Sequence, residues 1–93
     1  DAIVTPEPGK ITFPILKRLC GPGMVVTDEE ALEAVGLAYQ RLKIVLEPGG
    51  AVALAAALFR RDQIEGDAVI CVASGGNVDR DMFERALATL PAV

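Results

Sequence analysis

The chain has 93 residues, of which 52% are hydrophobic, and its 9 basic and 13 acidic side chains give a formal net charge of −4. This length allows at most one small domain, and the apolar content is more typical of a piece of a larger body than of a free domain with a polar surface. The basic residues form no patch, which argues against nucleic-acid binding. The longest apolar stretch, Ala51 to Phe59, is about half as long as a membrane span requires, so no membrane association is expected.

Elements in the first quarter of the chain are short. Residues 1–10 contain two prolines and a glycine and form an irregular approach segment. Thr12 is a possible N-cap of a helix that continues to about Leu19 and tolerates Pro14 in its first turn. Gly-Pro-Gly then ends the helix, and residues 24–26 are a candidate short strand.

Thr27 opens the clearest predicted helix. Thr27 and Glu30 have the spacing of a capping box, in which each side chain satisfies a backbone N–H group of the other residue. An apolar face at helical spacing follows, so the helix is expected to continue to Leu42, the last residue of that face. That face consists of Leu32, Val35, Tyr39 and Leu42.

An apolar link, residues 44–46, leads to the turn Glu47-Pro48-Gly49-Gly50, and Ala51 to Phe59 is then apolar on every side of a helical wheel. Such a helix is expected to be surrounded by protein. Residues 60–62, Arg-Arg-Asp, should mark the point where it reaches solvent.

Ala68 to Ala73 is an apolar run without alternation, which is typical of a central strand of a parallel sheet, covered on both faces. Asp79 should cap a last helix that ends before Pro91. The apolar face of that helix is Met82, Phe83, Ala86, Leu87 and Leu90. A central strand needs hydrogen-bonded neighbours on both edges, and the chain offers none of sufficient length. We therefore predict an α/β fragment, helices plus one central parallel strand, that completes a sheet lying in other sequence.

Ser74-Gly75-Gly76-Asn77 follows this strand and opens the last helix. Ligands collect at the carboxyl ends of strands in open parallel sheets, and paired glycines let a backbone approach a ligand closely. A tight strand-to-helix turn, with Asn77 or Asp79 as a cap, explains the same residues equally well. From the residues alone, both interpretations stay open.

The run Ser74 to Asp79, with Glu47 to Ala51 some two dozen residues before it, resembles the serine/threonine dehydratases and serine racemases. These are fold-type-II, tryptophan synthase beta-like, pyridoxal-phosphate enzymes. Further segments resemble the family in the same order: Thr12 to Ile15, Thr27 to Glu30, and Leu42-Lys43. The chain departs from many relatives in having Gly49-Gly50 where they have Ser-Gly or a similar pair.

The resemblance implies that residues 1–93 are the C-terminal part of the cofactor-binding catalytic domain. Ser74 would hydrogen-bond the pyridine nitrogen of pyridoxal phosphate, while Gly75 and Gly76 give the ring room. Glu47 would lie near the cofactor, although a solvated turn carboxylate is about as plausible. A neutral hydroxyl does not hold the ring nitrogen protonated as a carboxylate would, which favours elimination over racemisation.

The family's Schiff-base lysine and its phosphate-gripping glycine loop belong to the N-terminal half of such enzymes. The lysines here, Lys10, Lys17 and Lys43, lie in no matching context, so the segment alone has no catalytic residue and should be inactive. The family's divalent-cation ligands also precede the segment, so no metal site is carried over. The expected partners are the remainder of the same polypeptide and a small hydroxy-amino acid, and the intact enzyme should be a homo-oligomer.

The intact enzyme is thus expected to convert threonine or serine to a 2-oxo acid and ammonia. A racemase or a 3-hydroxyaspartate dehydratase on the same scaffold stays open, as does a noncatalytic module that binds a small anion or a protein partner. A regulatory appendage is less well supported, because the cofactor motif lies inside the segment. No signal peptide is recognisable, which makes a cytoplasmic location the default, with Cys20 and Cys71 reduced.

Overall fold

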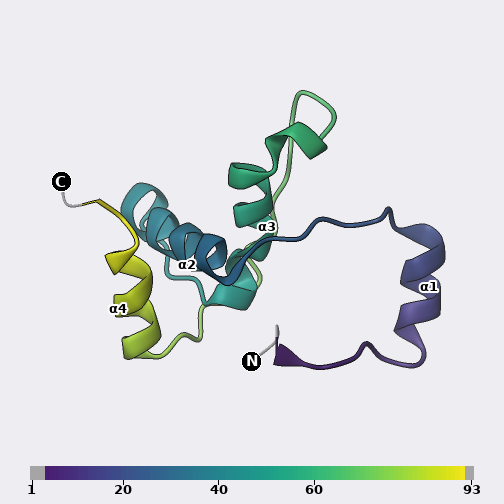
Figure 1. Ribbon diagram of the computed structural model, residues 1–93, viewed down its shortest axis with the longest axis horizontal. Coiled ribbons are helices and arrows are strands. Elements are labelled where there is room, and N and C mark those ends of the chain that lie inside the picture. The colour runs from purple at the N-terminus through teal and green to yellow at the C-terminus, as the bar shows by residue number, and fades with distance from the viewer. Residues whose placement is uncertain (1–3, 92–93) are drawn as a thin grey trace.

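The structure is a computed structural model that describes residues 4–91. In this range the chain forms helices joined by extended segments, and no strand is present (Figure 1). The elements in chain order are α1 (Thr12–Leu19), α2 (Asp28–Leu37), a π-helix (Ala38–Leu42), α3 (Pro48–Phe59), a short 3-10 helix (Arg61–Gln63) and α4 (Arg80–Ala88).

The core lies where α2 packs against α3 on one side and α4 on the other. Val35 of α2 is its largest fully buried side chain, and most of the other buried core residues are alanines. These small side chains let the helices approach closely. At Gly36 of α2, an added Cβ atom would lie 2.8 Å from the carbonyl oxygen of Ala86 in α4. Tyr39 and Phe83 close one end of the α2–α4 contact with an edge-to-face ring pair, their centroids 5.2 Å apart.

Two helix starts confirm the predictions made from local sequence. The Glu30 N–H group donates to the Thr27 hydroxyl at 3.1 Å, and the Thr27 N–H group donates to the Glu30 carboxylate at 2.9 Å, which is the complete capping box. At α4, the Met82 N–H group donates to the Asp79 carboxylate at 2.8 Å. Both caps use residues within three positions of one another, so the sequence alone could predict them.

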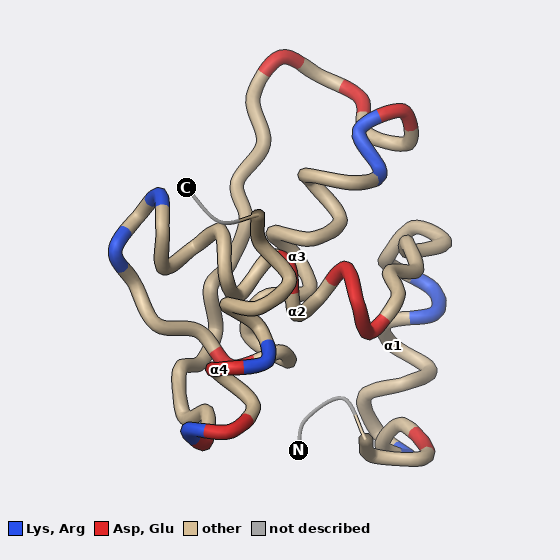
Figure 2. Tube along the Cα trace, turned by 60° about the vertical axis from the view of Figure 1, so that its left-hand side comes forward, with Lys and Arg blue, Asp and Glu red and all other residues tan. Residues whose placement is uncertain are grey.

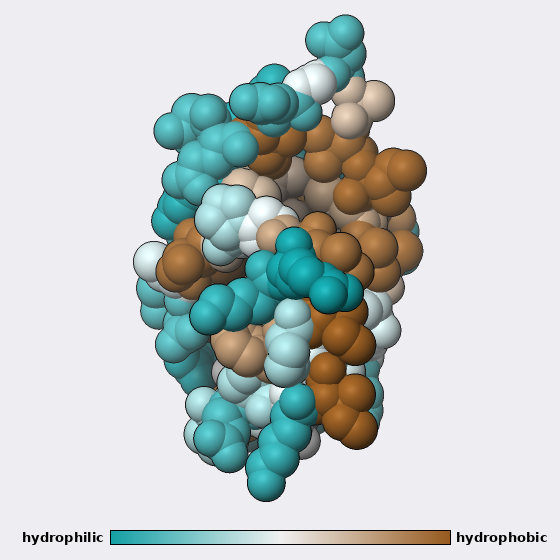
Figure 3. All heavy atoms as spheres, turned by 90° about the vertical axis from the view of Figure 1, so that its right-hand side faces the viewer, coloured by the Kyte–Doolittle hydropathy of each residue, from teal (hydrophilic) through white to brown (hydrophobic). Residues whose placement is uncertain are grey.

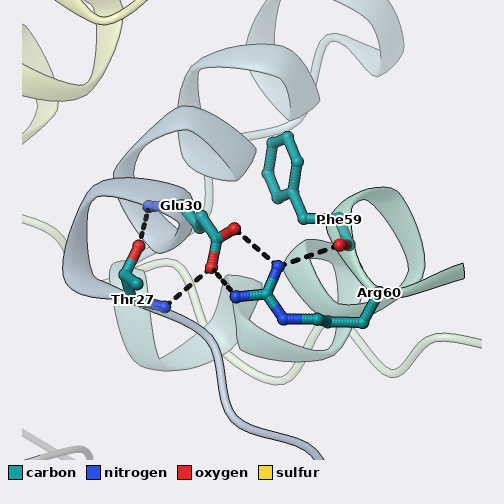
Figure 4. Close-up of polar contacts among 4 residues, drawn as sticks. All are labelled: Thr27, Glu30, Phe59 and Arg60. Atoms are coloured by element: carbon teal, nitrogen blue, oxygen red, sulfur yellow. Dashed lines mark hydrogen bonds and ion pairs between the residues drawn. The ribbon is translucent and has the colours of Figure 1, made fainter. Parts of the chain in front are cut away.

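Glu30 has a second partner that the sequence does not indicate. The Arg60 guanidinium donates to both Glu30 carboxylate oxygens at 2.7 Å, and it also donates to the Phe59 carbonyl oxygen at 2.8 Å (Figure 4). As predicted, α3 ends just before residues 60–62, but Arg60 is only partly exposed and joins the end of α3 to the start of α2. The following residues, Arg61 and Asp62, are exposed as predicted.

This pair gives a test of pH dependence. The pKa of Glu30 is lowered, chiefly by its hydrogen bonds with Arg60 and to a smaller extent by the hydrogen bond from the Thr27 N–H group. A carboxyl group whose pKa is lower in the folded state stabilises that state above its unfolded pKa and loses this contribution as the pH falls through the folded value. We expect Glu30→Gln to lower the urea midpoint of the chain at neutral pH, and the difference from the unsubstituted chain to narrow on acidification.

The control is Glu84→Gln, which breaks the exposed Arg80–Glu84 pair on α4. Exposed pairs of this kind contribute little, so its urea midpoint should hardly change at any pH. Equal effects of Glu30→Gln and Glu84→Gln, or a difference that does not depend on pH, would contradict the assignment.

Two helix boundaries differ from the prediction. The α2 helix was expected to continue regularly to Leu42, but after Leu37 it widens into the π-helix, which ends where Lys43 adopts a left-handed φ of 60°. Because of this change, Leu42 is exposed instead of joining the apolar face. At α1 the predicted N-cap was wrong: Ile11 is the cap residue, Thr12 is the first helical residue, and no side chain caps the helix.

The α1 helix stands apart from the rest of the chain, at the end of extended segments (Figure 1). None of its residues is buried, although Phe13, Ile15 and Leu16 are large and apolar. Likewise, α3 buries only the side that carries Gly50, Ala51, Ala55 and Ala56. The expectation that protein surrounds α3 is thus met on one side by residues 4–91.

The predicted central strand at residues 68–73 is not confirmed, and neither is the short strand at 24–26. Residues 68–73 form no backbone hydrogen bond with any described residue, and Ile70 is 94% exposed. The physical reason is that a strand exists only when another strand pairs with it, and residues 4–91 offer no such neighbour. Within residues 4–91, the apolar run is therefore a largely exposed segment without strand structure.

The chain exposes far more surface than a free protein of its size. Its accessible area is 7273 Å² for a mass of 9.8 kDa, whereas a folded monomer of this mass exposes about 5,200 Å². Viewed from the side of α1, apolar side chains gather along one margin of the molecule (Figure 3). This excess is expected of a segment that packs against further protein.

Candidate functional site

The turn that begins α3 lies directly beside the loop that precedes α4. The Glu47 N–H group donates to the Gly75 carbonyl oxygen at 3.0 Å, and within the turn itself the Gly50 N–H group donates to the Glu47 carbonyl oxygen at 2.9 Å. Two segments separated by some two dozen residues are thus joined by main-chain contact. The structure brings Glu47 and Gly75, two of the three predicted cofactor-binding residues, together.

Glycines make this approach possible. An added Cβ atom at Gly50 would lie 2.7 Å from the Gly75 nitrogen and closer still to its carbonyl oxygen. A Cβ atom at Gly75 would collide with the Glu47 carboxylate, and one at Gly76 with the Val45 carbonyl oxygen. Real Cβ atoms essentially never come within 3.0 Å of such atoms, so side chains at Gly50 and Gly76, which would meet backbone, would force the segments apart, whereas the Glu47 carboxylate could turn away from a side chain at Gly75.

Ser74, the third predicted residue, lies at the exposed start of this loop. Its hydroxyl makes no hydrogen bond with any residue in the range 4–91. A serine hydroxyl both donates and accepts, so it is available to a ligand or to protein outside this segment.

An open hollow of about 710 Å³ lies next to the loop, where the N-terminal ends of α2, α3 and α4 meet. Its lining includes Glu47 but neither Ser74 nor Gly75, so the structure does not place all three predicted residues in one cavity. The other residues that line it are Val4, Asp28, Ala31, Leu32, Pro48, Gly49, Asn77, Val78, Asp79, Met82 and Arg85. Sequence reasoning missed Arg85 in particular, because helical periodicity does not show which helix ends converge.

The charges around the hollow are mainly negative. Asp28, Glu47 and Asp79 contribute three carboxylates against the single guanidinium of Arg85. Acidic residues are also frequent along the rest of the chain (Figure 2). These side-chain charges oppose a phosphate group, whereas the N-terminal ends of the three helices favour an anion.

The sequence profile of the family described as pyridoxal-phosphate dependent enzyme matches residues 1–75, which include the α3 turn and the start of the loop. The chain belongs to this family of pyridoxal-phosphate dependent enzymes.

Its similar proteins are amino-acid lyases and racemases. The chain is 36% identical over 94% of its length to L-threonine ammonia-lyase of Thermotoga maritima, of which it covers 21%. It is 38% identical over 85% of its length to serine racemase of Dictyostelium discoideum, covering 25% of that protein. The chain is also 34% identical over 94% of its length to L-threo-3-hydroxyaspartate ammonia-lyase of a Pseudomonas species, of which it covers 27%. The chain therefore spans about a fifth to a quarter of these relatives.

No solved structure gives a significant match to the chain. Among the residues described, no helix has the length and apolar character needed to cross a membrane.

The site fits one edge of the cofactor. A hydroxyl with no partner in residues 4–91 can hydrogen-bond a ring nitrogen, and the Gly-Gly pair beside it lets the loop pack closely against Glu47 and Val45. The other groups that pyridoxal phosphate requires do not converge here. No lysine lines the hollow, and the Lys43 ammonium donates to the Gln40 carbonyl oxygen at 2.8 Å instead. The described residues thus suit the ring and supply neither a covalent attachment nor a phosphate site.

Proposed function

We propose that this chain is the C-terminal part of the cofactor-binding domain of a pyridoxal-phosphate-dependent ammonia-lyase that converts threonine or serine to a 2-oxo acid and ammonia. The observation that carries the proposal is the Ser74-Gly75-Gly76 loop held against the Glu47 turn, in a chain whose relatives include L-threonine ammonia-lyases.

In this proposal, Ser74 hydrogen-bonds the pyridine nitrogen and fixes the tilt of the ring. The absence of side chains at Gly75 and Gly76 lets the loop lie against the Glu47 carboxylate and the Val45 carbonyl oxygen, which would keep Ser74 in position. When bound, the cofactor supplies an electron sink for the bond broken at the α-carbon of the amino acid. The residues of this chain orient that sink and moderate its strength, because a hydroxyl is neutral at pH 7.

The rest of the enzyme is the partner that this proposal requires. It would supply the lysine and the phosphate-binding loop, pair with residues 68–73, and cover the apolar residues of α1. The exposed area of 7273 Å², well above that of a free protein of the same mass, supports such a partner. A homo-oligomeric state and a cytoplasmic location stay predictions from the sequence.

A racemase on the same scaffold is the second candidate, since relatives at 38% and 32% identity are named serine racemase. The noncatalytic anion-binding module is less well supported, because three carboxylates line the hollow beside the loop.

A chimera tests the proposal. We would replace the matched segment of the Thermotoga maritima L-threonine ammonia-lyase, 21% of that protein, with this chain. The chimera should bind pyridoxal phosphate, absorb near the visible edge as lysine-bound cofactor does, and release a 2-oxo acid from threonine or serine. Competing the two substrates would show which one is preferred.

The 93-residue chain alone serves as the control and should give neither signal. A chimera that folds, as judged by circular dichroism, but neither binds the cofactor nor forms the 2-oxo acid would refute the proposal. Formation of D-serine from L-serine in excess of pyruvate would favour the racemase instead.

A further inference from the structure

We propose that Gly50 is a positioning residue for Ser74: its lack of a side chain sets how closely the Ser74 loop lies against the start of α3. This inference rests on the proposed function, in which Ser74 contacts the cofactor ring.

The contact is made by the main chain on both sides. Gly50 is buried in the first turn of α3, and the position its Cβ atom would take is 2.7 Å from the nitrogen and 3.0 Å from the carbonyl carbon of Gly75. Gly75 follows Ser74 directly, so a displacement of Gly75 also displaces the hydroxyl. Neither side has a flexible side chain that could turn aside.

A hydrogen bond fixes the register of the contact. The Glu47 N–H group donates to the Gly75 carbonyl oxygen at 3.0 Å, and this same oxygen is the atom closest to an added Cβ atom at Gly50. A methyl group at position 50 would thus push away the oxygen that Glu47 holds. Restoring an ordinary van der Waals distance requires the loop to move by roughly 1 Å.

A displacement of this size matters for a ring contact, because hydrogen bonds weaken steeply with distance and angle. Gly50 is not a catalytic residue, since it touches neither the ring nor the substrate in this proposal. It acts through the position of the loop, and the predicted consequence is a change in how the cofactor is held.

The test is Gly50→Ala in the chimera, with Gly36→Ala as the matched control. Both substitutions place a methyl group against backbone, but at Gly36 the nearest atom is the Ala86 carbonyl oxygen, in the α2–α4 contact. We expect both to lower the urea midpoint. Only Gly50→Ala should raise the dissociation constant for pyridoxal phosphate, by about tenfold, and alter the absorbance and fluorescence of the bound cofactor.

Unchanged cofactor affinity and spectra in Gly50→Ala would overturn the inference, and so would equal changes in Gly36→Ala. If Gly50→Ala does not fold, amide hydrogen exchange in the unsubstituted chimera tests whether the turn and the loop respond together to the cofactor. Cofactor binding should then slow exchange at the Glu47 amide together with Gly75 and Gly76, and protection confined to the loop would overturn the inference. A chimera that binds no cofactor would overturn the proposed function itself. A chimera that binds the cofactor with the same affinity and spectra with and without Gly50→Ala would overturn only this inference.

Discussion

In the chimera, Ser74→Asp is expected to raise the ratio of D-serine to pyruvate formed from L-serine by about tenfold, which corresponds to a change of about 1.4 kcal/mol between the two barriers. The expectation follows from the different charge of the two side chains. A hydroxyl can hydrogen-bond a ring nitrogen without favouring its protonated form. A carboxylate at the same place is negatively charged and therefore favours the protonated nitrogen.

The product ratio depends on what happens to the electron pair left at the α-carbon. In the proposed function, Ser74 would hold the ring nitrogen through a neutral hydroxyl, so the bound cofactor would supply a moderate electron sink that favours loss of the β-hydroxyl group. A carboxylate at position 74 would favour the protonated nitrogen and strengthen that sink, which would favour reprotonation at the α-carbon. In the proposed function, the side chain at position 74 would thus shift the partition between elimination and racemisation without touching the substrate.

Asn77→Asp is the matched control, because it adds the same charge three positions further along the loop, at an exposed residue that lines the hollow. It should leave the ratio within about twofold of the unsubstituted chimera, since a screened charge at that distance acts weakly. An unchanged ratio in Ser74→Asp, measured with the cofactor fully bound, would remove the assigned role of the hydroxyl. Equal changes in the two variants would point to general charge rather than to contact with the ring.

Val35→Ala is expected to lower the free energy of unfolding of the chain by about 2 kcal/mol, because it removes buried methyl groups and leaves a cavity. Val35 is the largest side chain with no exposed surface, and it lies on α2, which packs against both α3 and α4. Loss of its contacts therefore weakens both helix interfaces at once. Urea unfolding followed by circular dichroism measures the effect.

Val25→Ala makes the same truncation at a residue that is 83% exposed. Its effect on the free energy of unfolding should stay within about 0.5 kcal/mol. A small effect of Val35→Ala, similar to that of Val25→Ala, would show that α2 does not form the centre of the core.

The features that could be predicted from the sequence are those that neighbouring residues determine. Thr27 with Glu30, and Asp79 with Met82, lie three positions apart, so their caps follow from local spacing. The apolar face of α2 was correctly expected at Leu32 and Val35, which are both buried.

The features that could not be predicted depend on distant parts of the chain. The Glu30–Arg60 pair joins residues 30 positions apart, and nothing in either local sequence indicates the other partner. In the candidate site, the sequence motif singled out the Ser74 loop and the Glu47 turn. It did not show that Gly50 meets Gly75 main chain to main chain, because that contact depends on how α3 lies beside the loop. The strand predicted at residues 68–73 is not formed within residues 4–91, and no sequence pattern within the chain indicates a strand long enough to pair with it.

The uncovered run from Ala68 to Ala73 also affects how this chain behaves when it is made alone. It has no charge and no proline, and its backbone groups form no bond with the described residues, which are the properties of an aggregation-prone segment. Separate copies would pair through this edge with increasing concentration. Unfolding and control measurements on the chain alone should therefore be made at low concentration.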